Sequence, residues 1–100
     1  MKNVILSADG DRYVYCIPDE SADNLEKYCM EFCDDWLKTS PNADKYRVNG
    51  ILYYNQSDFI EYLNKWVFPE KRSKLVENLG WIPFDAPVPD KYKECPQFNF

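Results

Sequence analysis

The chain has 100 residues, 45% of them hydrophobic and 17% aromatic, and a formal net charge of -5 at pH 7. This length fits one domain with an ordinary hydrophobic core, and the hydrophobic fraction excludes a disordered chain. No apolar run approaches the roughly 20 residues of a membrane span, and the N-terminus lacks the apolar region and cleavage site of a signal peptide, so we expect a cytoplasmic protein that does not act at a membrane.

The first part of the chain predicts a β-hairpin. Two runs rich in β-formers, at 2–8 and 12–17, flank the sequence Asp-Gly-Asp at 9–11, which is typical of a tight turn. Pro18 ends the second strand, because proline cannot donate a hydrogen bond to a sheet.

The strongest helical pattern runs from Leu25 to about Lys38. Its apolar side chains recur three and four residues apart, which places them on one face of a helix. They are Leu25, Tyr28, Cys29, Phe32, Cys33, Trp36 and Leu37. We expect all of them in the core, with a mostly acidic face turned to solvent.

The middle of the chain predicts a second hairpin and a second helix. Asn49-Gly50 between β-formers is the strongest short-range signal for a type I′ turn. Asn55 or Ser57 is placed to cap the helix that follows. The apolar positions of that helix repeat the same spacing: Phe59, Ile60, Leu63, Trp66 and Val67.

A third helix is expected over about 70–79, because Leu75, Val76 and Leu79 fit helical spacing and Gly80 is a good residue to end a helix. Four prolines after position 82 then favour an extended tail. That tail carries aromatic residues, namely Phe84, Tyr92, Phe98 and Phe100. We therefore expect a domain at 1–82 and a tail at 83–100 that packs on it.

These elements predict a small α+β fold in the order β-β-α-β-β-α-α. We expect an antiparallel sheet of three or four strands covered by helices mainly on one face, followed by the proline-rich extended C-terminal tail.

The sequence predicts no catalytic residue, no metal site and no cofactor. There is no histidine, which removes the commonest general base and most catalytic zinc sites. Cys29 and Cys33 lie within the first helix, and no second cysteine pair completes a zinc site. The three glycines form no phosphate-binding loop, and no G-x-S-x-G motif is present. We therefore expect a protein that is not an enzyme.

Acidic residues are concentrated in the first part of the chain. Residues 1–44 hold ten acidic and four basic side chains, whereas 45–100 hold seven and eight. Asp34 and Asp35 lie near the end of the first predicted helix, where the dipole disfavours anions. A basic cluster of Lys71, Arg72 and Lys74 lies at the start of the third predicted helix, where the dipole disfavours cations. Either the two clusters face each other, or one of them serves a partner, or the placement has no meaning.

The predicted function is protein binding without catalysis. We expect an adaptor, an immunity protein or a regulatory subunit that presents acidic side chains and tyrosines to a basic protein partner. The residues proposed for this contact are Glu31, Asp34, Asp35, Tyr53 and Tyr54. An isoelectric point near 4.6 argues against direct nucleic-acid binding. Two alternatives stay open: an acidic inhibitor that imitates nucleic-acid phosphates, and an enzyme or ligand-binding domain with an aromatic-lined pocket.

Overall fold

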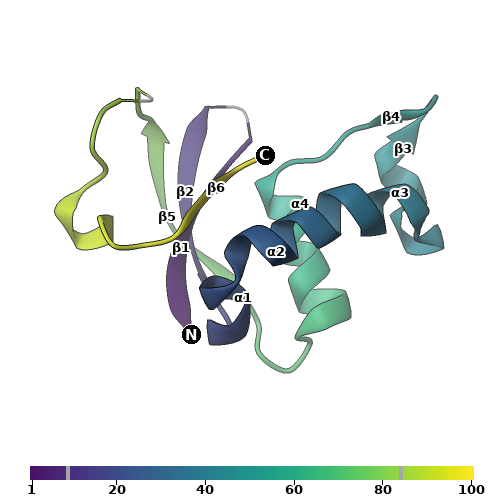
Figure 1. Ribbon diagram of the computed structural model, residues 1–100, viewed down its shortest axis with the longest axis horizontal. Helices are drawn as coiled ribbons and strands as arrows, with labels where there is room; N and C mark the ends of the chain where they lie inside the picture. The colour runs from purple at the N-terminus through teal and green to yellow at the C-terminus, as the bar shows by residue number, and fades with distance from the viewer. Residues whose placement is uncertain (9, 84) are drawn as a thin grey trace.

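A four-stranded sheet and a group of helices lie side by side in this protein (Figure 1). The computed structural model describes residues 1–8, 10–83 and 85–100. Two expectations fall partly outside these residues: Asp9 belongs to the predicted first turn and Phe84 to the predicted tail. The fold is a small α+β domain, as the sequence predicts.

The sheet has the strand order β5-β2-β1-β6. Strands β1 (Lys2–Ser7) and β2 (Asp11–Ile17) form the predicted antiparallel hairpin, and β5 (Lys74–Trp81) pairs antiparallel with β2. Strand β6 (Gln97–Asn99) pairs with the other edge of β1 and runs parallel to it. The sheet is therefore mixed, and the expectation of a purely antiparallel sheet was wrong.

The third predicted helix, over 70–79, is also wrong, because strand β5 occupies most of this segment. Leu75, Val76 and Leu79 fit helical spacing, but three apolar residues do not distinguish a helix from a bulged strand. The pairing with β2 contains two register shifts, and Gly80 has a φ of 71° inside the strand instead of ending a helix. Tertiary pairing decides the outcome, since the backbone groups along β2 need partners.

The first helical stretch follows β2 and changes its geometry along its length. It comprises α1 (Asp19–Asp23), α2 (Leu25–Met30), the π-helix η1 (Glu31–Trp36) and the short α3 (Leu37–Thr39). A π-helix closes wider turns than an α-helix and changes which side chains share a face. Cys33, which the α-helical period predicts in the core, is consequently only half-buried.

The second helix, α4 (Gln56–Tyr62), continues into a second π-helix, η3 (Leu63–Val67). Of the two predicted caps, Asn55 and not Ser57 begins the helix. Its side chain accepts hydrogen bonds from the backbone N–H groups of Ser57 and Asp58, and the Asp58 carboxylate accepts one from the N–H of Asn55. This reciprocal arrangement satisfies backbone donors that a helix start leaves unpaired.

Between the two helices the chain forms the 3-10 helix η2 (Pro41–Tyr46) and a small hairpin of β3 (Arg47–Val48) and β4 (Ile51–Leu52). Asn49 and Gly50 have φ values of 52° and 81°, the left-handed conformations that a type I′ turn requires. The predicted second hairpin is confirmed, but it forms its own two-stranded sheet away from the main one (Figure 1).

Side chains on both faces of the main sheet are buried. The helices cover one face, and the core there includes Val4, Leu6, Tyr15, Ile17, Phe32, Leu37, Phe59 and Leu63. The other face holds a smaller cluster of Ile5, Val14 and Tyr92, with Leu79, Val88 and Cys95 packed against it. The segment that covers this second face contains the 3-10 helix η4 (Asp90–Tyr92) and leads into β6. Residues 83–100 are therefore not a proline-rich extended tail, because part of them completes the sheet.

A polar contact fastens this segment to β5. The hydroxyl of Tyr92 donates a hydrogen bond of 2.5 Å to the carboxylate of Glu77. Lys91 Nζ lies 3.3 Å from the same carboxylate. The hydrogen bond from Tyr92, and then that from Lys91, hold the pKa of Glu77 below its ordinary value.

The depressed pKa of Glu77 predicts a pH-dependent contribution to stability. Stabilisation is present above the ordinary glutamate pKa of 4.5 and is lost as the pH falls through the lower value in the folded protein. We expect Glu77→Gln to lower the urea midpoint at pH 7, with the difference from wild type shrinking below about pH 4. Urea unfolding of both proteins between pH 3 and 7 checks this, and a difference that does not change with pH would contradict it.

Candidate functional site

The carboxylates predicted to bind a partner lie exposed on the first helical stretch and have different neighbours. Asp34 pairs with Lys38 at 3.7 Å and lies close enough to raise the pKa values of Cys33 and Tyr54, for which burial is the larger cause. Glu31 and Asp35 instead lie near Tyr62 on the second helix. Glu31 and Asp35 therefore share Tyr62 as a neighbour, whereas Asp34 acts on Cys33 and Tyr54.

The two predicted tyrosines differ in their surroundings. Tyr53 is 59% exposed, and its backbone N–H donates to the carbonyl of Tyr46. Tyr54 is half-buried and packs edge-on against Phe32 and Phe100, with ring centroids 5.7 and 6.0 Å apart. Tyr54 therefore packs against the core, and of the two tyrosines only Tyr53 exposes most of its side chain to solvent.

The two π-helices create a feature that the α-helical period did not predict. In η1 the N–H of Leu37 donates to the carbonyl of Phe32, and in η3 the N–H of Phe68 donates to that of Leu63. Both bonds span five residues, which defines the π turn, and such turns occur frequently at functional sites. Each of the two π segments carries a tryptophan at or near its end.

These tryptophans meet on the outside of the molecule. The rings of Trp36 and Tyr62 have centroids 5.0 Å apart, and those of Trp36 and Trp66 are 6.4 Å apart. Trp66 is 47% exposed and Trp36 is half-buried, although the helical spacing assigned both to the core. The core position expected for Trp66 is wrong, whereas Trp36 packs against the core without being fully buried. We name the set Glu31, Asp35, Trp36, Tyr62 and Trp66 the acidic aromatic face.

The charges on the acidic aromatic face are negative. Burial raises the pKa of Tyr62, and the nearby carboxylates of Glu31 and Asp35 raise it further. Aromatic faces next to carboxylates suit a lysine or arginine side chain, because the ring quadrupole and the carboxylate both attract a cation.

The basic cluster faces elsewhere. Lys71 and Arg72 line a groove of about 410 Å³ together with Asp19 and Glu20. The N-terminal amine, followed by Lys2 and Lys71, lowers the pKa of Asp19. Among the residues that the structure describes, no ion pair joins this cluster to Asp34 or Asp35. The first of our three explanations, that the two clusters face each other, is therefore not supported.

The cysteines show no arrangement typical of a metal site. All four are free, Cys29 is fully buried, and burial raises the pKa of its thiol. Within residues 1–8, 10–83 and 85–100, no group of three or more cysteine or acidic side chains is placed to hold a metal ion. In the same ranges no helix combines the length and hydropathy that crossing a membrane requires.

Comparisons with known proteins assign no family to this chain. No family model matches the sequence, and neither the curated proteins nor the solved structures gave a match.

Proposed function

We propose that this protein works as a non-catalytic binding protein, of the adaptor, immunity or regulatory kind, whose partner is a protein with a basic surface. The observation that carries this proposal is the acidic aromatic face, where the exposed indole of Trp66 and the half-buried indole of Trp36 adjoin Tyr62, which has the carboxylates of Glu31 and Asp35 nearby. A lysine or arginine of the partner would lie on the rings and pair with Glu31 or Asp35.

The ion pairs elsewhere on the surface support this choice of face. Glu61 pairs with Lys45 and Lys65, and Asp44 pairs with Arg47, so these carboxylates are neutralised within the protein. In the described part of the chain, Glu31 and Asp35 have no such ion pair. Their charge is available to an outside cation, and the net charge of -5 would speed the encounter with a basic partner.

The tryptophans support a protein partner over a small ion. Tryptophan and tyrosine are the usual anchors of protein interfaces, because they bury a large area with few rotatable bonds. A half-exposed Trp66, whose ring is tilted against that of Trp36, supplies such an anchor. A partner that binds nucleic acid would favour the alternative of a nucleic-acid mimic, since such partners carry basic channels.

The test is capture of a partner from native lysate, followed by affinity measurement with that partner purified. We expect Glu31→Gln/Asp35→Asn and, separately, Trp66→Ala to weaken binding about tenfold or more, and added salt to weaken wild-type binding. Calorimetry at low and high salt measures both effects.

Matched variants keep the result specific. Glu26→Gln/Glu70→Gln removes the same charge from exposed positions outside the face, and Trp81→Ala removes an exposed indole from the sheet. Neither should change the affinity by more than about twofold. Equal losses in target and control variants would contradict the proposed face, and a captured substrate that the protein converts would contradict the absence of catalysis.

A further inference from the structure

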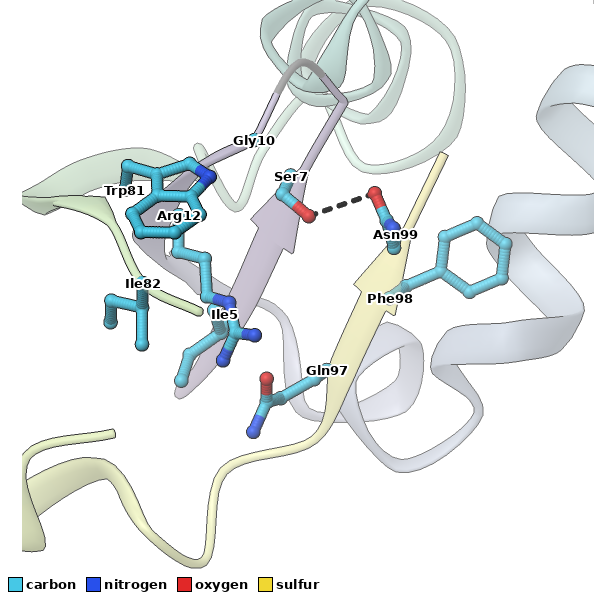
Figure 2. A pocket seen from close by; sticks show the side chains of 9 residues that line it. All are labelled: Ile5, Ser7, Gly10, Arg12, Trp81, Ile82, Gln97, Phe98 and Asn99. Carbon is cyan, nitrogen blue, oxygen red and sulfur yellow. Dashed lines mark hydrogen bonds between the residues drawn. The ribbon is translucent and has the colours of Figure 1, made fainter. Parts of the chain in front are cut away.

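A separate hollow lies on the sheet face opposite the main helices (Figure 2). Ile5 of β1 and Arg12 of β2 contribute to its floor, Trp81 at the end of β5 stands on one side, and Gln97 and Asn99 of β6 stand on the other. This open hollow has a volume of about 420 Å³, within the range of small-molecule sites. This hollow lies on the opposite side of the sheet from the acidic aromatic face.

Arg12 is the charged residue of this hollow. Its side chain is half-buried, and its guanidinium group reaches over the floor between Ile5 and Gln97 (Figure 2). In the ranges that the structure describes, no carboxylate lies within ion-pair distance of it. The other half-buried arginine, Arg47, donates to the carbonyls of Leu37 and Ser40 and to Asp44. Because burying an unpaired cation costs free energy, Arg12 is set to receive an anion.

The polar groups around Arg12 are also arranged as donors. Ser7 Oγ donates to Asn99 Oδ1 at 2.9 Å, which uses the amide oxygen and leaves its NH₂ group as a donor. Gln97, two residues earlier on the same face of β6, also lines the hollow, and its amide group points into it (Figure 2). Among the lining residues that the structure describes, none is an aspartate or a glutamate. The site therefore favours a ligand rich in hydrogen-bond acceptors.

Trp81 gives the hollow an apolar wall. Its side chain is 68% exposed, more than any other large hydrophobic residue of the described chain. The indole lies against Gly10, where a Cβ atom would come 3.1 Å from Trp81 Cδ1, and the φ of 103° there also favours glycine. Glycine thus permits the indole to lie at the rim, where it offers a surface for stacking a flat ring.

We propose that this hollow binds a small organic anion in which a carboxylate or phosphate is joined to a flat ring. The oxyanion accepts hydrogen bonds from Arg12 and Asn99, and the ring stacks on Trp81. An aromatic carboxylic acid and a nucleoside monophosphate share this chemistry, and separate probes distinguish them.

The test is an NMR titration of the full chain with indole-3-acetate, with adenosine 5′-monophosphate, and with acetate or inorganic phosphate as the matching anion without a ring. We expect one ring-bearing probe to shift the Trp81 indole N–H and the Arg12 side-chain signals, and to bind at least about tenfold more tightly than its ringless counterpart. Arg12→Gln and Trp81→Ala should each weaken that binding about tenfold.

The control is Arg72→Gln, which removes the same charge from an exposed arginine outside this hollow. It should leave the affinity unchanged, and the spectra of every variant report whether it is folded. The proposal fails if neither ring-bearing probe binds below about 10 mM, if the ringless anions bind equally well, or if Arg72→Gln weakens binding as much as Arg12→Gln.

Discussion

Phe32→Ala is expected to destabilise the protein by about 3 to 5 kcal/mol, a large share of the roughly 5 to 15 kcal/mol that holds a domain together. Phe32 is fully buried, and its ring packs against those of Trp36, Tyr54, Phe59, Tyr62 and Phe100. Because it joins both helices to the C-terminal end of the chain, the cavity left by alanine has rigid walls on several sides and collapses poorly.

Urea unfolding with fluorescence detection measures this loss, and the melting temperature should fall by on the order of 20 °C. Val48→Ala is the control: Val48 is 48% exposed in the β3–β4 hairpin, so its truncation should change stability by less than about 0.5 kcal/mol. A loss below about 1 kcal/mol for Phe32→Ala would mean that the aromatic cluster is loosely packed.

Truncation after Ile82 should remove most of the stability or abolish cooperative unfolding. It deletes Tyr92, which is 5% exposed, and Phe100, whose ring lies 5.6 Å from that of Phe59. Each buried aromatic contributes about 1.5 to 3 kcal/mol relative to exposure. The deletion also removes β6 from the edge of β1 and uncovers Ile5, which is otherwise buried.

A second truncation, after Cys95, separates the two contributions. It removes β6 but keeps Tyr92 and its hydrogen bond to Glu77. We expect an intermediate loss, because the bonds from Ile5 N–H to the Pro96 carbonyl and from Phe100 N–H to the Ser7 carbonyl disappear. Thermal and urea unfolding check both proteins. A melt unchanged by the longer deletion would show that residues 83–100 add nothing to the stability of the fold.

Several elements could be predicted from the sequence because their causes are local. The type I′ turn at Asn49-Gly50 needs two left-handed residues, and this dipeptide adopts them at low cost. The capping of α4 by Asn55 depends only on residues within one turn. The first hairpin and the buried position of Phe32 follow from short-range pattern as well.

Local pattern also accounts for half of the acidic aromatic face. Glu31 and Asp35 were expected on the solvent side of the first predicted helix, and both are exposed, whereas their shared neighbour Tyr62 comes from the packing of the second helix. The part that Trp36 and Trp66 play in this face could not be predicted from the sequence. Both lie in π-helical segments, and the spacing of the apolar residues does not reveal a π-helix.

Only the tertiary structure decided the rest. The segment at 74–81 becomes a strand because it pairs with β2, more than fifty residues earlier in the chain, and 97–99 becomes a parallel edge strand because β1 has a free edge there. Arg12, Trp81 and Asn99 come from distant parts of the sequence, and no local spacing relates them. Short-range preferences determine turns, caps and buried helix faces, whereas strand pairing and the hollow built on it depend on contacts between residues that the sequence alone leaves unconnected.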